Sequence, residues 1–101
     1  KEIYLQGDND TIVRKNSEYS FRTYLYKKYI SSKDKNNLQS FVTTYKQDIF
    51  PCRSFQRWLN FSSKYCNDHF FIDYNEPGLQ LIFEMMAPGM SRKTYKIINE
   101  E

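Results

Sequence analysis

The sequence has few of the residues that interrupt or cross-link a small fold: three glycines, three prolines and two cysteines among 101 residues. With 40% hydrophobic residues, this composition is typical of a folded domain and excludes a low-complexity or disordered chain. No apolar run approaches the roughly 18 residues that span a membrane, so we expect no membrane partner. The chain shows no signal peptide and no initiator methionine. We therefore expect a single domain over residues 1–101, excised from a larger protein.

Cysteine and histidine are too scarce to favour metal or catalytic chemistry. On one helix, Cys52 and Cys66 would lie about 21 Å apart, whereas a disulfide needs Cα atoms within about 7 Å. We expect two free thiols in a reducing nuclear or cytoplasmic compartment. Cys66 and His69 have a metal-like spacing, but zinc needs four ligands, and we expect no metal and no other cofactor. General acid–base catalysis needs paired titratable groups, so we expect neither an enzyme nor a small-molecule substrate.

Aromatic and basic side chains are what the sequence has in quantity. Nine tyrosines, eight phenylalanines and one tryptophan make 18% of the chain, and tyrosine suits both core edges and contact surfaces. Residues 11–64 hold eleven Lys and Arg against three Asp and Glu, a net charge of +8, while residues 1–10 sum to −2 and residues 65–101 to −3. This asymmetry favours a polyanion or an acidic partner, although a solvated helix surface carries lysine as readily.

Three amphipathic segments predict helices. The first covers residues 18–30 with Ser17 as its cap, the second covers residues 35–48 with Asp34 as its cap, and the third runs over residues 51–66. In each, apolar residues recur at helical spacing and predict a core stripe. The stripes consist of Phe21, Tyr24, Leu25 and Tyr29, then Leu38, Phe41, Val42, Tyr45 and Ile49, then Phe55, Trp58, Leu59, Ser62 and Cys66.

Residues 69–86, HFFIDYNEPGLQLIFEMM, contain two apolar runs and predict a β-hairpin. Tyr74 would face either Leu79 or Leu81, and Pro77-Gly78 suits a type II turn within a loop longer than two residues. Both registers place the same side chains on the core face. These are Phe70, Ile72, Tyr74, Leu79, Leu81, Phe83 and Met85.

The two ends of the chain complete the expected fold. Residues 3–6 and 11–14 are β-prone and predict either a hairpin or a strand and a turn. Residues 91–99 fit a short helix capped by Ser91 or a third strand, and we favour the helix. Three helices followed by a hairpin is the order of a winged helix, so we predict an α+β, winged-helix-like fold with an added N-terminal strand.

A polar face on the third predicted helix is the first candidate site. Its members share helical spacing, and Phe61 and Tyr65 border them. The set is Arg53, Gln56, Arg57, Asn60 and Lys64. Arginine matches guanine, while asparagine and glutamine match adenine, so we expect DNA or RNA binding, with this helix in a major groove. The alternative is an ordinary solvated helix face.

A protein partner is the second hypothesis. Tyr19, Arg22 and Tyr26 would share one face of the first helix, and Phe71 and Ile82 would lie on the outer face of the hairpin. Tyrosine and arginine are favoured anchors at protein interfaces, and these surfaces would suit an adaptor or a dimerisation module. Packing of long side chains at the domain edge is the competing explanation.

Short sequence features also suggest a family. Phe21-x-x-x-Leu25 opens the first predicted helix, and Ile72-Asp73, Leu81-Ile82-Phe83 and Ala87-Pro88 follow near the end. Together they resemble the SPK domain, a module of nematode proteins that also carry SET, PHD-finger or kinase domains. The resemblance implies a chromatin or gene-silencing setting and no known biochemical activity. The element order is also similar to that of the LOTUS module, which binds proteins or RNA.

Overall fold

The computed structural model describes residues 3–4, 11–14 and 16–99. These residues form an α+β fold with a mixed six-stranded sheet, a separate two-stranded sheet and three helices. The helices are α1 (Ser32–Thr44), α2 (Arg53–Leu59) and α3 (Pro77–Met86). The strands are β1 (Ile3–Tyr4), β2 (Thr11–Arg14), β3 (Phe21–Leu25), β4 (Lys28–Tyr29), β5 (Ile49–Pro51), β6 (Tyr65–Cys66), β7 (Phe71–Tyr74) and β8 (Ser91–Asn99).

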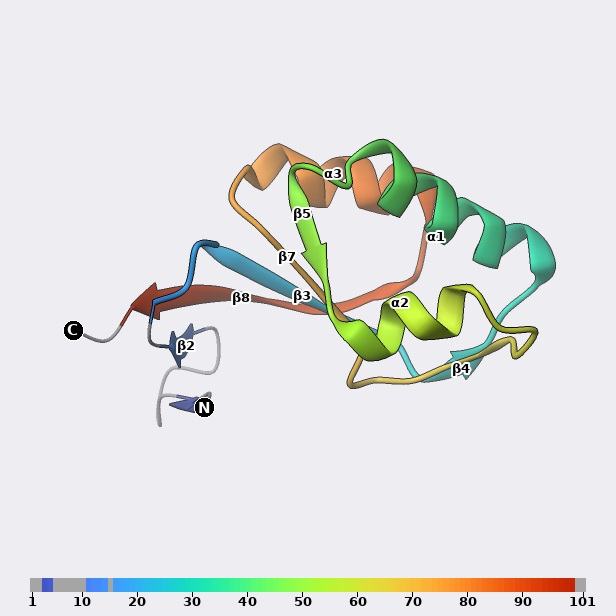
Figure 1. The fold of residues 1–101 in the computed structure, drawn as a ribbon, viewed down its shortest axis with the longest axis horizontal. Coiled ribbons are helices and arrows are strands. Elements are labelled where there is room, and N and C mark those ends of the chain that lie inside the picture. Colours follow the sequence, from blue (N-terminus) through green and yellow to red (C-terminus); the bar gives the residue numbers. More distant parts are fainter. Residues whose placement is uncertain (1–2, 5–10, 15, 100–101) are drawn as a thin grey trace.

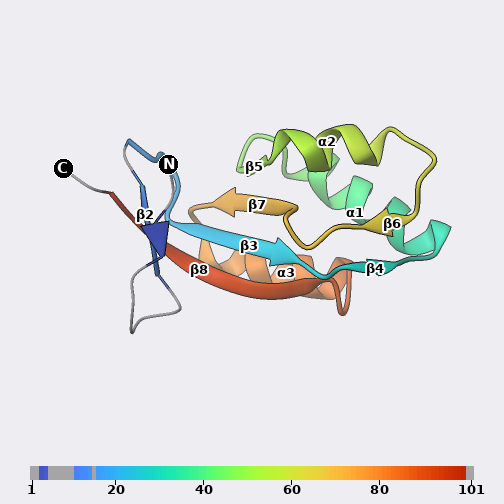
Figure 2. The same cartoon turned by 90° about the horizontal axis from the view of Figure 1, so that it is seen from below.

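The large sheet has the order β1-β2-β8-β3-β7-β5. Strands β2 and β8 run parallel, and the other neighbours pair antiparallel. Strands β4 and β6 form their own antiparallel ribbon beside the end of the sheet (Figure 2). The central strand β3 comes from the first quarter of the chain, whereas its two neighbours, β7 and β8, come from the last third.

Helices α1 and α3 lie together on one face of the sheet (Figure 1). The rings of Phe41 in α1 and Phe83 in α3 meet edge to face, with centroids 5.0 Å apart. Beneath them, Ile72 and Tyr74 of β7 close the layer against Leu79, and the gap left between these side chains has a volume of only about 10 Å³. This side of the sheet is close-packed core.

Helix α2 packs at the end of the sheet near β4 (Figure 1). Its inward side chains, Phe55 and Trp58, contact the ring of Phe70 at centroid distances of 5.6 and 5.5 Å. All three rings are buried in the same core cluster that holds α1 and α3. These three rings therefore join α2 to the sheet.

The predicted winged-helix order is wrong, and the first error is the helix expected over residues 18–30. This segment forms β3 and β4. Phe21 and Leu25 lie on the helix-covered side of the sheet, whereas Arg22 and Tyr24 alternate to the other side. Because β3 is central, both of its faces carry large side chains, and such a segment satisfies the helical period as well as the strand period.

The second error is the hairpin over residues 69–86. Its first half is the strand β7, but its second half is the helix α3. Leu79 and Phe83, four residues apart, are 7% and 3% exposed, while Leu81 and Met85 are 68% and 77% exposed. The alternation that placed Leu81 and Met85 in the core therefore does not exist. Pro77 occupies the first turn of α3, where proline is well tolerated.

The C-terminal segment is the third error, because residues 91–99 form the strand β8 and not a helix. Thr94, Tyr95, Ile97 and Ile98 are β-branched or aromatic residues, which favour strands. Strand β8 pairs with β3 on one side and with β2 on the other. Pairing with β3 and β2, which are distant in the sequence, therefore stabilises residues 91–99 as a strand.

The remaining element predictions are closer. The hairpin of the N-terminal segments is confirmed as β1 paired with β2, although residues 5–10 between them lie outside the described residues. The helix over residues 35–48 is confirmed as α1, but Ser31 caps it, with its Oγ accepting a hydrogen bond from the Asp34 N–H at 3.0 Å. Its predicted stripe does pack on the core: Leu38, Phe41, Val42 and Tyr45. The third predicted helix is α2, which is only seven residues long.

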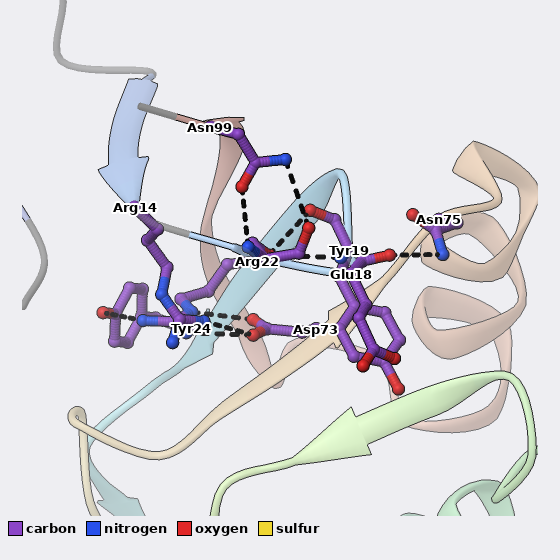
Figure 3. Close-up of polar contacts among 9 residues, drawn as sticks. Arg14, Glu18, Tyr19, Arg22, Tyr24, Asp73, Asn75 and Asn99 are labelled. Atoms are coloured by element: carbon purple, nitrogen blue, oxygen red, sulfur yellow. Dashed lines mark hydrogen bonds and ion pairs between the residues drawn. The ribbon is translucent and has the colours of Figure 1, made fainter. Parts of the chain in front are cut away.

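An ion pair joins the two central strands on the side of the sheet away from α1 and α3. Arg22 donates hydrogen bonds from Nε and Nη2 to the two carboxylate oxygens of Asp73, at 2.7 and 2.9 Å (Figure 3). The guanidinium lies 3.6 Å above the ring of Phe71, and Arg14 approaches the same carboxylate at 3.4 Å. Both charges of the Arg22–Asp73 pair are buried, so their geometry has to be satisfied within the fold.

A pair of substitutions in residues 77–86 distinguishes the helix α3 from the hairpin that the sequence predicted. Leu79→Ala should lower the free energy of unfolding by about 2–5 kcal/mol, because a buried leucine leaves a cavity. Leu81→Ala, the matched control two residues away, should change it by less than about 0.5 kcal/mol. Urea denaturation of both variants measures the difference. A hairpin would bury both leucines, so equal large losses would contradict the helix.

Candidate nucleic-acid interface

The short helix α2 presents the polar residues that the sequence singled out. Arg53, Gln56, Arg57 and Asn60 are all exposed, and Lys64 is exposed in the loop that follows. Gln56 donates from Nε2 to the Pro51 carbonyl at 2.7 Å, and Asn60 donates from Nδ2 to the Gln56 carbonyl at 3.3 Å. Three of the five thus lie on α2, a helix of only two turns, while Asn60 caps its C-terminal end and Lys64 follows in the loop.

A buried lysine fixes the backbone of residues 60–64, which we call the 60–64 loop. The ammonium group of Lys35 in α1 donates to the carbonyls of Phe61 and Ser63, the latter at 2.6 Å. It also lies 4.4 Å above the ring of Trp58. Burial lowers the pKa of Lys35, and the nearby charge of Lys64 lowers it further. Lys35 therefore holds the loop from below.

The side chains of this loop remain on the surface. The Phe61 side chain is 64% exposed although its carbonyl is held by Lys35. Lys64 is exposed too, and its carbonyl accepts a hydrogen bond from the Ile30 N–H at 2.9 Å, which joins the loop to the end of β4. The exposed Phe61 ring and the exposed Lys64 ammonium group are therefore attached to a backbone that is held by Lys35 and by the hydrogen bond from Ile30.

The β4–β6 ribbon adds a pair of tyrosines, whose rings are in contact and tilted by 54°, next to this loop. Tyr29 and Tyr65 are directly opposed across the ribbon, with ring centroids 4.7 Å apart. Tyr29 is 79% exposed. We group these two residues with Phe61 and Lys64 of the adjoining loop and call the four the aromatic–basic ledge.

A groove runs from the 60–64 loop along the contact between α1 and α2. One hollow of about 340 Å³ is lined by Ser32, Lys35, Asn36, Gln39, Leu59, Phe61, Ser62 and Lys64. A second hollow of about 180 Å³ is lined by Gln39, Val42, Thr43, Gln56, Leu59 and Asn60. Because Gln39 and Leu59 line both, the two hollows are adjacent, and we call them together the α1–α2 groove. Its volume is in the range of sites that bind small ligands, roughly 300–1,000 Å³.

The residues expected to contact a protein partner do not come together. The helix face that would hold Tyr19, Arg22 and Tyr26 does not form, because the segment is a strand. Tyr19 stacks on a ring in β5, Arg22 is buried in its ion pair, and Tyr26 is 45% exposed. Phe71 lies under the Arg22 guanidinium, and Ile82 packs against the core.

Two apolar residues that the sequence placed in the core lie instead on the outer face of α3. Leu81 and Met85 are one turn apart and have exposures of 68% and 77%. A helical reading of residues 79–86 would have found them, because Leu79, Ile82, Phe83 and Met86 alone complete the stripe at i, i+3, i+4 and i+7.

Cysteine and histidine do not assemble a site among the described residues. Cys52 and Cys66 are both buried and free, so the prediction of two free thiols is confirmed. Burial raises the pKa of the Cys66 thiol to about 12. His69 is exposed, and within residues 3–4, 11–14 and 16–99 no three His, Cys, Asp or Glu side chains gather as metal ligands would.

Comparison with known proteins identifies no relative. No family model matches the chain, and neither a curated protein nor a solved structure matches it significantly. The resemblance to the SPK domain therefore stays a prediction. The resemblance to the LOTUS module is also untested by these comparisons, and the element order that suggested it is not the order that the chain forms. None of the helices in the described part of the chain is long and apolar enough to span a bilayer.

The aromatic–basic ledge could be found only in part from the sequence. Phe61 and Tyr65 were placed at the border of the polar face of the third helix; in the structure Phe61 follows the C-cap of α2 and Tyr65 begins β6. Tyr29 was assigned to a core stripe, because the strand β4 was taken for a helix. The role of Lys35 has no local signal, since its two acceptors lie 26 and 28 residues away.

Replacing Lys35 tests how the loop is held. Lys35→Met should lower the free energy of unfolding by about 1–3 kcal/mol, because two partly buried carbonyls lose a charged donor. It should also speed amide hydrogen exchange in residues 61–65. Lys33→Met, a change of the same side-chain type at an exposed position of α1, should stay within about 0.5 kcal/mol of the wild type. Equal effects of the two changes would mean that Lys35 does not support the loop.

Proposed function

We propose that this protein is a non-enzymatic recognition module that binds single-stranded nucleic acid on the aromatic–basic ledge and the adjoining surface of α2. The observation that carries the proposal is the exposed ring of Phe61 together with the Tyr29–Tyr65 pair that follows Lys64, in which Tyr29 is exposed and Tyr65 is half-buried. Proteins that bind single strands combine such stacking platforms with cations that contact the phosphates. The basic excess of residues 11–64 supports the same class of partner.

A single strand suits the geometry better than a duplex does. Docking in a major groove was expected from a winged helix, and that fold is not what the chain forms. Seven residues make α2 about 10 Å long, and a ribbon of two-residue strands lies beside it in place of a long wing. Exposed aromatic rings contribute to binding only when bases are unstacked and free to lie on them.

The cations of α2 would contact the phosphates. Arg53 and Arg57 are exposed one turn apart, and Lys64 follows in the loop. Such contacts position a strand without selecting its sequence. We place the protein in a nuclear or cytoplasmic setting and, from the resemblance to the SPK domain alone, in chromatin or gene silencing.

A protein partner is the second candidate function. The outer face of α3 favours it, because Leu81 and Met85 are the two most exposed aliphatic side chains of the described residues. This face is formed by a helix other than α2. Substitutions in the two regions therefore separate the two functions.

Fluorescence anisotropy with labelled single strands of DNA and RNA tests the proposed function. We expect binding at about 50 mM salt that weakens steeply at about 200 mM, because cations on the protein displace counterions from the phosphates. A duplex of the same length should bind more weakly. Phe61→Ala should weaken single-strand binding about 5- to 150-fold, the equivalent of about 1–3 kcal/mol of lost stacking.

The control for this experiment is Leu81→Ala, which also removes an exposed apolar side chain but lies on α3. It should leave the affinity for single strands unchanged. Absence of binding at low salt would refute the proposed function. Equal losses in Phe61→Ala and Leu81→Ala would refute the placement of the interface.

A further inference from the structure

The α1–α2 groove has a chemistry that the ledge lacks. Four of its lining side chains are carboxamides, two from α1 and two from the α2 side. These are Asn36, Gln39, Gln56 and Asn60. Leu59 and Val42 supply apolar surface between them, and the described residues that line the groove include no carboxylate. Carboxamides over an apolar floor suit the edges and faces of nucleic-acid bases.

We infer that the α1–α2 groove reads base edges and selects strands rich in bases with an exocyclic amine, adenine above all. This inference rests on the proposed function, because it assigns a base preference to the same nucleic-acid interface. The ledge supplies stacking and charge, which every base and every phosphate satisfies. The groove supplies the discrimination that the ledge cannot provide.

The two carboxamides on the α2 side have a fixed orientation. The Nε2 of Gln56 is bonded to the Pro51 carbonyl, and the Nδ2 of Asn60 is bonded to the Gln56 carbonyl. Each bond uses one of the two N–H donors of its carboxamide and leaves the side-chain oxygen without a hydrogen bond from the backbone, so that this oxygen can act as an acceptor. An acceptor matches the amine of adenine or cytosine and opposes the carbonyl oxygen of guanine or thymine.

The two carboxamides on α1 complete the recognition of adenine. Asn36 and Gln39 are exposed, lie three residues apart, and therefore fall on the same side of the helix. A carboxamide that both donates and accepts pairs with N7 and N6 of adenine together. In a single strand these edges are accessible. Adenine also offers a larger ring than cytosine to the apolar floor.

The groove is long enough for several bases. Along α1, Ser32 and Thr43 mark its two ends, and the eleven helical steps between them span about 16 Å. Stacked bases are about 3.4 Å apart, so the groove accommodates about four or five nucleotides. Lys64 and Phe61 lie at one end, where the groove meets the ledge.

Affinities for oligo(dA) and oligo(dT) of about 12 nucleotides, within the site sizes of single-strand-binding folds, test the inference. We expect the wild type to bind oligo(dA) about tenfold more tightly than oligo(dT). A surface that used only charge and stacking would not bind oligo(dA) more tightly than oligo(dT), because such surfaces tend to favour flexible pyrimidine strands. The double variant Asn36→Leu/Gln39→Leu should bring the two affinities to within about twofold by weakening oligo(dA) binding alone.

Oligo(dT) affinity serves as the internal control, since a misfolded variant would lose both strands. Gln47→Leu, an exposed glutamine just beyond α1 and outside the groove lining, should keep the preference of the wild type. Equal binding of both strands by the wild type would overturn the groove inference and leave the proposed function standing. A preference that survives in Asn36→Leu/Gln39→Leu would also overturn it. Loss of binding to both strands by the wild type would refute both.

Discussion

A buried ion pair between two central strands fixes the arrangement of the sheet. Arg22 of β3 lies directly opposite Asp73 of β7, and two hydrogen bonds join guanidinium and carboxylate. If either strand slipped by one residue, its charge would turn to the face that α1 and α3 cover and leave its partner buried alone, at a cost of about 3–5 kcal/mol. The pair therefore admits only the register in which Thr23 and Ile72 face the helices.

That register also determines where the candidate interface stands. Phe70, just before β7, packs against Trp58 of α2, and the Trp58 ring lies under the ammonium group of Lys35. Lys35 in turn holds the carbonyl of Phe61, whose side chain stays on the surface. A chain of contacts thus connects the centre of the sheet to the 60–64 loop. The loop can present its ring and its cation without a flexible backbone, which lowers the entropy lost on binding.

The sequence predicted best where polar and apolar residues separate cleanly. Helix α1 was found because only one face of it is apolar, whereas residues 18–30 and 79–86 are apolar on several sides and fit both the helical and the strand period. Neighbours distant in the sequence decide such segments: β8 pairs with β3 across about 70 residues. The polar residues of α2 were identified from local spacing. The support of the loop by Lys35 was not, because the contact is not local.

Chemical-shift mapping tests the account most directly. In an 15N-labelled protein titrated with oligo(dA), the account predicts that the shifted amides cluster in the 60–64 loop, in the β4–β6 ribbon and along the α1–α2 groove. The outer face of α3, marked by Leu81 and Met85, should remain unchanged. Shifts concentrated on α3, with none in the 60–64 loop, would contradict the account and favour the face that we assign to a protein partner.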